Sequence, residues 1–191
     1  YKDFAEFKSF IGKEISEERL FKSMLKSIYT KKHNVLIFSK DDSHPDCYLR
    51  IGHRIFLIEF KDYLMASKTM TSYNAEIFQK KLNLQFIEND KKNPKGVSQL
   101  ANQIRFLENS EYDFDIYTNS KIRRSKIEIY PIIVFTDLQY TMPGINSYLV
   151  KCFWTKYEDK SLFKEVNDPI MISMSFLMKY MQFFAFSNAP P

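Results

Sequence analysis

Glycine and cysteine are both scarce in this chain of 191 residues. The four glycines disfavour a glycine-rich loop architecture, and they disfavour disorder. The two cysteines, Cys47 and Cys152, are far apart and form no Cys-x-x-Cys pair, which argues against a disulfide framework. Such cysteine usage favours a reducing compartment, so we expect a cytoplasmic protein. The first residues show neither the basic nor the apolar region of a secretory signal.

Long uncharged apolar runs are missing as well. The longest apolar stretch begins at Pro169, and Lys179 interrupts it before it reaches the length of a comfortable membrane span. We interpret it as a buried helix or a contact surface, and we expect no membrane partner. The net charge of +5 is compatible with a polyanionic partner, although many proteins are this basic.

Apolar periodicity predicts alternating helices and strands. An amphipathic helix is expected over 14–28, with Ser16 as its N-cap. The strands and helices expected after it are a strand at 34–40, two strands at 46–51 and 54–61, helices at 74–89 and 97–109, a strand at 126–137 and a strand at 147–154 before a C-terminal helix. Pro131 within the strand at 126–137 implies a bulge or an unpaired position.

This order predicts an α/β fold with a mixed central β-sheet flanked by helices. We expect residues 1–191 to form a single domain, with a core at about 14–137. An insertion occupies about 62–95, and a C-terminal strand and helix occupy about 147–186.

The hairpin between the second and third strands carries charges inside an apolar pattern. Gly52-His53 is the natural two-residue turn, because glycine at the first central position suits a type II′ hairpin. With this turn, Tyr48 faces Leu57 and Asp46 faces Glu59, on one side of the sheet. Lys61 shares that side, two residues beyond Glu59, and can reach the same place.

Two carboxylates that face each other across neighbouring strands repel unless a positive charge offsets them, and a divalent cation would do so. Charged residues at the frayed end of a strand are the alternative interpretation of Glu59 and Lys61. The third member, Asp46, favours a functional site, because the turn alone sets its position opposite Glu59. Zinc is disfavoured, since the spacing of His44, Cys47 and His53 fits no zinc pattern.

Pro45-Asp46, 12 intervening residues and Glu59-Phe60-Lys61 resemble the signature of the PD-(D/E)XK, or restriction-endonuclease-like, nucleases. The resemblance covers about residues 14–137, in the order helix, three strands, helix, strand. It implies that Asp46, Glu59 and the backbone carbonyl of Phe60 bind Mg²⁺, for which Mn²⁺ substitutes. It also implies that Lys61 orients or deprotonates the attacking water and stabilises charge on the phosphate.

Two further positions follow from the same resemblance. A glutamate on the first helix often reaches the metal, and Glu17 is the candidate, with Glu14 and Glu18 as alternatives. A glutamine often lies on the helix after the third strand, where Gln99 fits and Gln103 follows one turn later. A first-turn helix acid and a surface glutamine are the respective structural alternatives.

These observations predict a magnesium-dependent nuclease, an endo- or exodeoxyribonuclease that hydrolyses phosphodiester bonds in DNA rather than RNA. The competing prediction is a nuclease-fold module that binds nucleic acid or a protein partner without cleaving. A homodimer through the Met-rich C-terminal helix is compatible with both.

Overall fold

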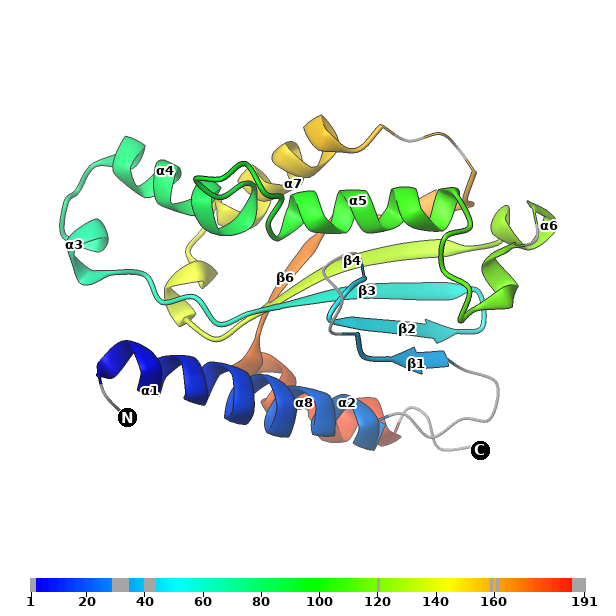
Figure 1. Ribbon diagram of the computed structural model, residues 1–191, viewed down its shortest axis with the longest axis horizontal. Coiled ribbons are helices and arrows are strands. Elements are labelled where there is room, and N and C mark those ends of the chain that lie inside the picture. Colours follow the sequence, from blue (N-terminus) through cyan, green and yellow to red (C-terminus); the bar gives the residue numbers. More distant parts are fainter. Residues whose placement is uncertain are drawn as a thin grey trace.

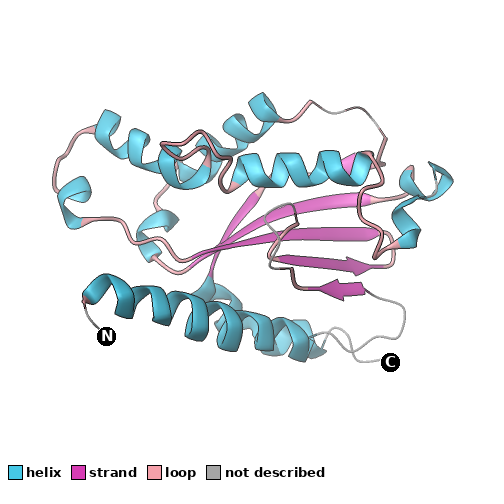
Figure 2. Ribbon diagram, viewed as in Figure 1, coloured by secondary structure: helices cyan, strands magenta, loops and turns pink. Residues whose placement is uncertain are grey.

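The computed structural model describes residues 3–28, 35–39, 44–119, 121–158, 160 and 162–186. They form three layers, with a twisted sheet between two layers of helices (Figures 1 and 2). The strands are β1 Val35–Ile37, β2 Cys47–Ile51, β3 Arg54–Lys61, β4 Glu128–Phe135, β5 Glu165–Val166 and β6 Ile170–Ser173. The expected mixed α/β sheet flanked by helices is therefore confirmed.

The helices divide between the two faces of the sheet. The N-terminal helix is continuous in three segments, α1 Phe4–Phe10, the π-helical η1 Ile11–Phe21 and α2 Lys22–Ile28. The remaining helices are α3 Ser67–Met70, α4 Ala75–Phe86, α5 Val97–Glu108, η2 Ile116–Asn119, α6 Lys121–Arg124, η3 Leu138–Thr141, α7 Ile145–Lys156 and α8 Met174–Phe186. The N-terminal helix and α8 cover one face, whereas α5 and α7 cover the other (Figure 1).

The sheet is antiparallel on one side of β3 and parallel on the other. β1, β2 and β3 form an antiparallel meander, and β4 runs parallel to β3 over its whole length. The hairpin register is the expected one, since Tyr48 pairs with Leu57 and Ile51 pairs with Arg54. Gly52 has a φ of +60°, which the first central position of the turn requires.

Pro131 lies within β4 without a bulge on its β3 side, where it pairs with Leu57. On the opposite side β5 pairs with Glu128 and Ile129, and β6 pairs from Ile132 onward. The main-chain oxygen of Ile129 accepts from Asn167 on that side, so Pro131, two residues later, faces the same way. The proline thus takes the position between two short strands where no N–H is needed, which confirms the expected unpaired position.

Successive side chains of β3 point to opposite faces of the sheet, and both faces of the strand are buried. Ile55 and Leu57 pack under α5 with Leu100 and Ile104. Ile58 and Phe60 pack against the N-terminal helix and α8, and the ring of Phe60 stacks on that of Phe21 at 5.1 Å. The charged residues at the end of β3 are therefore enclosed by two apolar layers.

The expected start of the first helix was wrong. The helix begins at Phe4, where the Asp3 side chain caps it by accepting from the N–H of Glu6 at 2.8 Å, and Ser16 lies in its interior. An aspartate three residues before a glutamate is a helix-start pattern, and it moves the boundary of the core ten residues earlier than expected.

The expected strand at 147–154 was also wrong, because these residues belong to helix α7. Its β-branched and aromatic composition is typical of a strand, but Ile145, Leu149 and Phe153 recur at four-residue spacing and are all buried. The apolar run from Pro169 contains β6 before α8 begins at Met174. Among the described residues, no helix is long and apolar enough to cross a membrane.

Gly96 offers a test of how α5 is positioned. It has a φ of +47°, and a Cβ added there would lie 2.8 Å from the main-chain oxygen of the buried Phe86. We expect Gly96→Ala to lower the free energy of unfolding by roughly 3 kcal/mol, from backbone strain plus displacement of Phe86. Urea unfolding followed by circular dichroism measures this loss.

Gly52→Ala is the matched control, because Gly52 has a similar φ of +60° but open space around its Cα. It should cost only about 1 kcal/mol, the strain of the left-handed conformation. Equal losses for the two variants would show that the contact with Phe86 does not constrain α5.

Candidate metal centre

The candidate site forms where the C-terminal end of β3 extends past Cys47, the first residue of β2. The ladder between these strands stops at the pair Cys47 and Ile58, so the backbone of Phe60 extends past its antiparallel partner. There the Asp46 carboxylate replaces a main-chain partner and accepts from the N–H of Phe60 at 2.7 Å. Because the N–H and C=O of one residue leave an antiparallel strand on the same side, the Phe60 carbonyl also faces Asp46.

The Lys61 ammonium lies between two carboxylates. Its Nζ is 2.6 Å from Oε2 of Glu59 and 4.0 Å from Oδ2 of Asp46. The Glu59 side chain is 1% exposed and that of Lys61 is 9% exposed, whereas Asp46 is 30% exposed. The structure therefore brings Asp46, Glu59 and Lys61 together, with Glu59 buried and Asp46 at the surface.

A glutamine of α5 completes the surroundings of Glu59. The side-chain amide of Gln103 donates to Oε1 of Glu59, and Gln103 is 1% exposed. Gln99, by contrast, is not brought to the site, because its Oε1 accepts from the N–H of Gly96 at 2.9 Å and so caps α5. Gln103, one turn later, is the glutamine that contacts the cluster.

Burial shifts the pKa values of the two buried partners. Burial raises the pKa of Glu59 to about 7; the neighbouring Lys61 lowers it, and Asp46 raises it further. For Lys61, burial lowers the pKa, but the negative charges of Glu59 and Asp46 outweigh burial and leave it raised. Lys61 is thus held firmly in its charged form.

Tyr112 lies near Glu59, in a segment that the sequence did not connect with the site. Its hydroxyl is buried and has no hydrogen-bond partner within the described part of the chain. Burial raises its pKa, and the charge of Glu59 adds to that effect, which places the hydroxyl in the field of the carboxylate. Its ring stacks on His44 with the centroids 4.9 Å apart.

Glu17 approaches Asp46 from the other face of the sheet. The N-terminal helix packs on the side of Phe60, opposite to the side where Gln103 reaches Glu59. Burial raises the pKa of Glu17, and the charge of Asp46 raises it further. Of the two alternatives, Glu14 is exposed and Glu18 pairs with Lys22 at 2.6 Å.

Lys22 is a second buried lysine, which the sequence interpretation missed. It is 5% exposed, and its Nζ lies 2.6 Å from Glu18 and 3.6 Å from Glu17. The four-residue spacing from Glu18 to Lys22 is a helix ion-pair pattern that could have identified it. No comparable signal exists for Tyr112, which arrives from a loop distant in the sequence.

The donor chemistry of the cluster fits a magnesium ion, because carboxylate and carbonyl oxygens are the ligands that this cation prefers. The number of such ligands is small, however. Among the residues that the structure describes, no group of three or more acidic, histidine or cysteine side chains is arranged to hold a metal ion. Two carboxylates and the Phe60 carbonyl converge, with Glu17 beside Asp46.

Basic residues outside the candidate site differ in their burial. Arg124 is buried and donates to main-chain oxygens of Thr118 and Glu108, so it serves the fold. Lys91, Lys92 and Lys95 lie around an exposed turn.

No family model, curated protein or solved structure matches the chain. The resemblance to PD-(D/E)XK nucleases therefore rests on the motif residues and on their arrangement.

The buried ion pair predicts a specific pattern of stabilities in metal-free buffer. Lys61→Met leaves the Glu59 carboxylate buried without its cation and should cost about 3 kcal/mol near pH 8. The double variant Glu59→Gln/Lys61→Met should return to within about 1 kcal/mol of the parent, since neither charge remains. Urea unfolding of the three proteins measures both effects.

The loss in Lys61→Met should depend on pH. The pKa of Glu59 in the folded parent, about 7, already exceeds its ordinary value, and removing Lys61 raises it further. The folded state then favours protonated Glu59, so the penalty is full above that raised pKa and shrinks as the pH falls from it toward the parent's value of about 7. A loss independent of pH would contradict a buried, charged Glu59.

Proposed function

We propose that this protein is a metal-dependent nuclease of the restriction-endonuclease-like class, hydrolysing phosphodiester bonds in DNA. The observation that carries the proposal is the convergence of Asp46 and Glu59 on the Lys61 ammonium at the C-terminal end of β3. A purely structural ion pair does not require the second carboxylate, which the antiparallel hairpin supplies.

The order of elements supports the same class. The N-terminal helix, β1, β2, β3, α5 and β4 follow one another as helix, three strands, helix and strand, and β4 pairs in parallel with β3. The short α3 and the longer α4 fall within the insertion, between Lys61 and α5. In this proposal β5, β6, α7 and α8 are additions to the core.

Asp46, Glu59 and the Phe60 carbonyl would hold Mg²⁺ or Mn²⁺, with Glu17 reaching it from the N-terminal helix. When bound, such an ion would supply a Lewis acid for the phosphodiester and a more acidic water. Asp46 is the ligand at the surface, which leaves Glu59 as the buried anchor.

Lys61 and Gln103 have separate roles in this scheme. Lys61 has a raised pKa, so it serves as a fixed cation that orients water and stabilises charge on the phosphate, rather than as a base. Gln103 donates to Glu59 and fixes the direction of its carboxylate. Gln103 is therefore a positioning residue in this scheme.

A nuclease-fold module that binds nucleic acid without cleaving it is the second candidate. The Lys61 ammonium already offsets one of the two carboxylate charges in this structure, and a module without metal would keep that arrangement. A homodimer through α8 is compatible with either, because Phe176 and Met178 are exposed while Met174 and Leu177 are buried within the chain.

Removing the acid at the surface of the site should abolish cleavage. We expect Asp46→Asn, and the double variant Glu59→Gln/Lys61→Met, to lower the rate of Mg²⁺-dependent DNA cleavage by about 10²-fold or more. Asp113→Asn, at an exposed acid, is the control and should cleave normally. The measurement is the release of labelled fragments, with the fold checked by circular dichroism.

Undiminished cleavage in both variants would overturn the assignment. If the parent protein neither cleaves DNA nor binds Mg²⁺ in calorimetric titration, the binding module is favoured instead.

Two glutamines one turn apart on α5 provide a matched pair. Gln103→Ala should weaken Mg²⁺ binding by about 10- to 100-fold, because the Glu59 carboxylate loses the group that orients it. Gln99→Ala should leave metal affinity unchanged and cost about 1 kcal/mol of stability, from the lost cap at Gly96. Isothermal titration separates the two; equal effects on metal affinity would refute the positioning role of Gln103.

A further inference from the structure

The acids and lysines of the candidate site form one connected cluster. The Nζ of Lys61 lies 2.6 Å from Glu59 and 4.0 Å from Asp46. Asp46 in turn lies close enough to Glu17 for its charge to raise the pKa of that carboxyl group. The cluster therefore extends from Glu59, beneath α5, to the N-terminal helix on the other face of the sheet.

Lys22 is the second cation of this cluster. Its Nζ is 2.6 Å from Glu18 and 3.6 Å from Glu17. The contacts of Lys22 and Lys61 thus join two ammonium groups to four carboxylates, so the acids exceed the lysines by two charges. Buried charges are stable when they are paired or coordinate a metal, and one divalent cation would balance this excess.

Lys61 holds the carboxylate that a metal ion would need. Oε2 of Glu59 accepts from the ammonium, and Oε1 accepts from the side-chain amide of Gln103. The Glu59 side chain is only 1% exposed. A metal ion that takes Glu59 as a ligand therefore competes with these two partners for its oxygens.

Of the two partners, Lys61 is the one that a metal ion opposes. A divalent ion bound to Glu59 would lie close to the ammonium, and like charges at short range repel strongly in a buried site. Gln103 carries no charge, so its amide can keep its bond to Glu59 while one cation replaces the other. The lysine is thus the partner that should leave.

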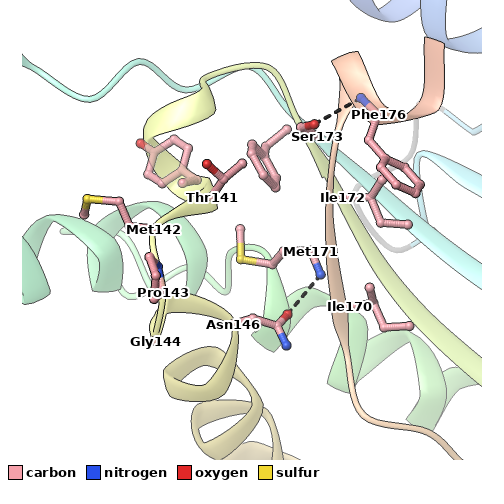
Figure 3. A pocket seen from close by; sticks show the side chains of 12 residues that line it. Thr141, Met142, Pro143, Gly144, Asn146, Ile170, Met171, Ile172, Ser173 and Phe176 are labelled. Atoms are coloured by element: carbon pink, nitrogen blue, oxygen red, sulfur yellow. Dashed lines mark hydrogen bonds between the residues drawn. The ribbon is translucent and has the colours of Figure 1, made fainter. Parts of the chain in front are cut away.

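A hollow of about 500 Å³ elsewhere on the protein has none of this charge (Figure 3). The residues that line it include no charged side chain. Two of its polar groups are used inside the protein, since Asn146 accepts from the N–H of Met171 and Ser173 accepts from that of Phe176, both at 3.1 Å. A cation would find no carboxylate there, in contrast to the cluster around Lys61.

We infer that Lys61 is the resident cation of the free site and releases Glu59 when a divalent metal ion binds. The inference rests on the proposed function for the presence of that ion. In the free protein the ammonium is bonded to Glu59, so it becomes available to a phosphate only once the metal has taken its place. Lys61 thereby lowers the affinity of the site for the metal.

Metal binding without DNA tests this inference. Lys61→Met removes the ammonium but keeps an unbranched side chain, so Mg²⁺ meets the two carboxylates without a competing cation. We expect Lys61→Met to bind Mg²⁺ at least about tenfold more tightly than the parent in calorimetric titration. A lysine that served the fold alone would give no such gain.

Thermal stability gives a second readout, which applies even if the variant folds poorly without metal. A tenfold gain in affinity should add about 3 to 6 °C to the rise in melting temperature that Mg²⁺ produces. Differential scanning fluorimetry measures this rise for both proteins. If Lys61→Met is unfolded in EDTA, circular dichroism should show it folding as Mg²⁺ is added.

Two variants serve as controls. Lys61→Arg keeps the positive charge and should bind Mg²⁺ within about threefold of the parent. Lys151→Met removes an exposed lysine of α7 and should change neither the affinity for Mg²⁺ nor the melting temperature rise.

Equal or weaker Mg²⁺ binding by Lys61→Met, or an equal gain in Lys61→Arg, would overturn the inference. A Lys61→Met protein that Mg²⁺ stabilises no more than the parent would do the same. The assays need no turnover, so tighter metal binding by Lys61→Met together with a parent that cleaves no DNA would overturn the nuclease proposal alone.

Discussion

The arrangement of the candidate site depends on one interaction, the Lys61 ammonium held between the carboxylates of Glu59 and Asp46. Without a cation there, two acids would be forced together at the end of a buried strand, at a cost that folding could not readily offset. The lysine lets the chain fold with both acids in place.

That interaction constrains the surrounding structure. Glu59 can be fully buried only because Lys61 and Gln103 bond its two oxygens, and Gln103 reaches it only because α5 packs closely on β3. The close approach of Gly96 to Phe86 sets where α5 begins. A contact between two backbones thus determines which glutamine faces the carboxylate.

The sequence was informative where local rules decide geometry. A two-residue turn at Gly52-His53 fixes the register, and alternation then places Glu59 and Lys61 on one face. The sequence was uninformative where packing between distant segments decides the geometry. Gln99 and Gln103 lie one turn apart on the same side of α5, so the choice between them depends on where the helix lies along its axis relative to β3. At 147–154 the strand-like composition does not decide the structure, because Ile145, Leu149 and Phe153 bury one face of a helix.

Alternation at the end of β3 also explains why the strand can serve two regions at once. Glu59 and Lys61 point toward α5, whereas Phe60 and Asp62 point toward the N-terminal helix and line a cleft of about 450 Å³ beside that helix. Asp46 precedes the first residue of β2 and accepts from the N–H of Phe60. It therefore lies between the two faces of the sheet, near both Lys61 and Glu17. Four consecutive residues therefore connect the charged centre on one side of the sheet with a cleft on the other.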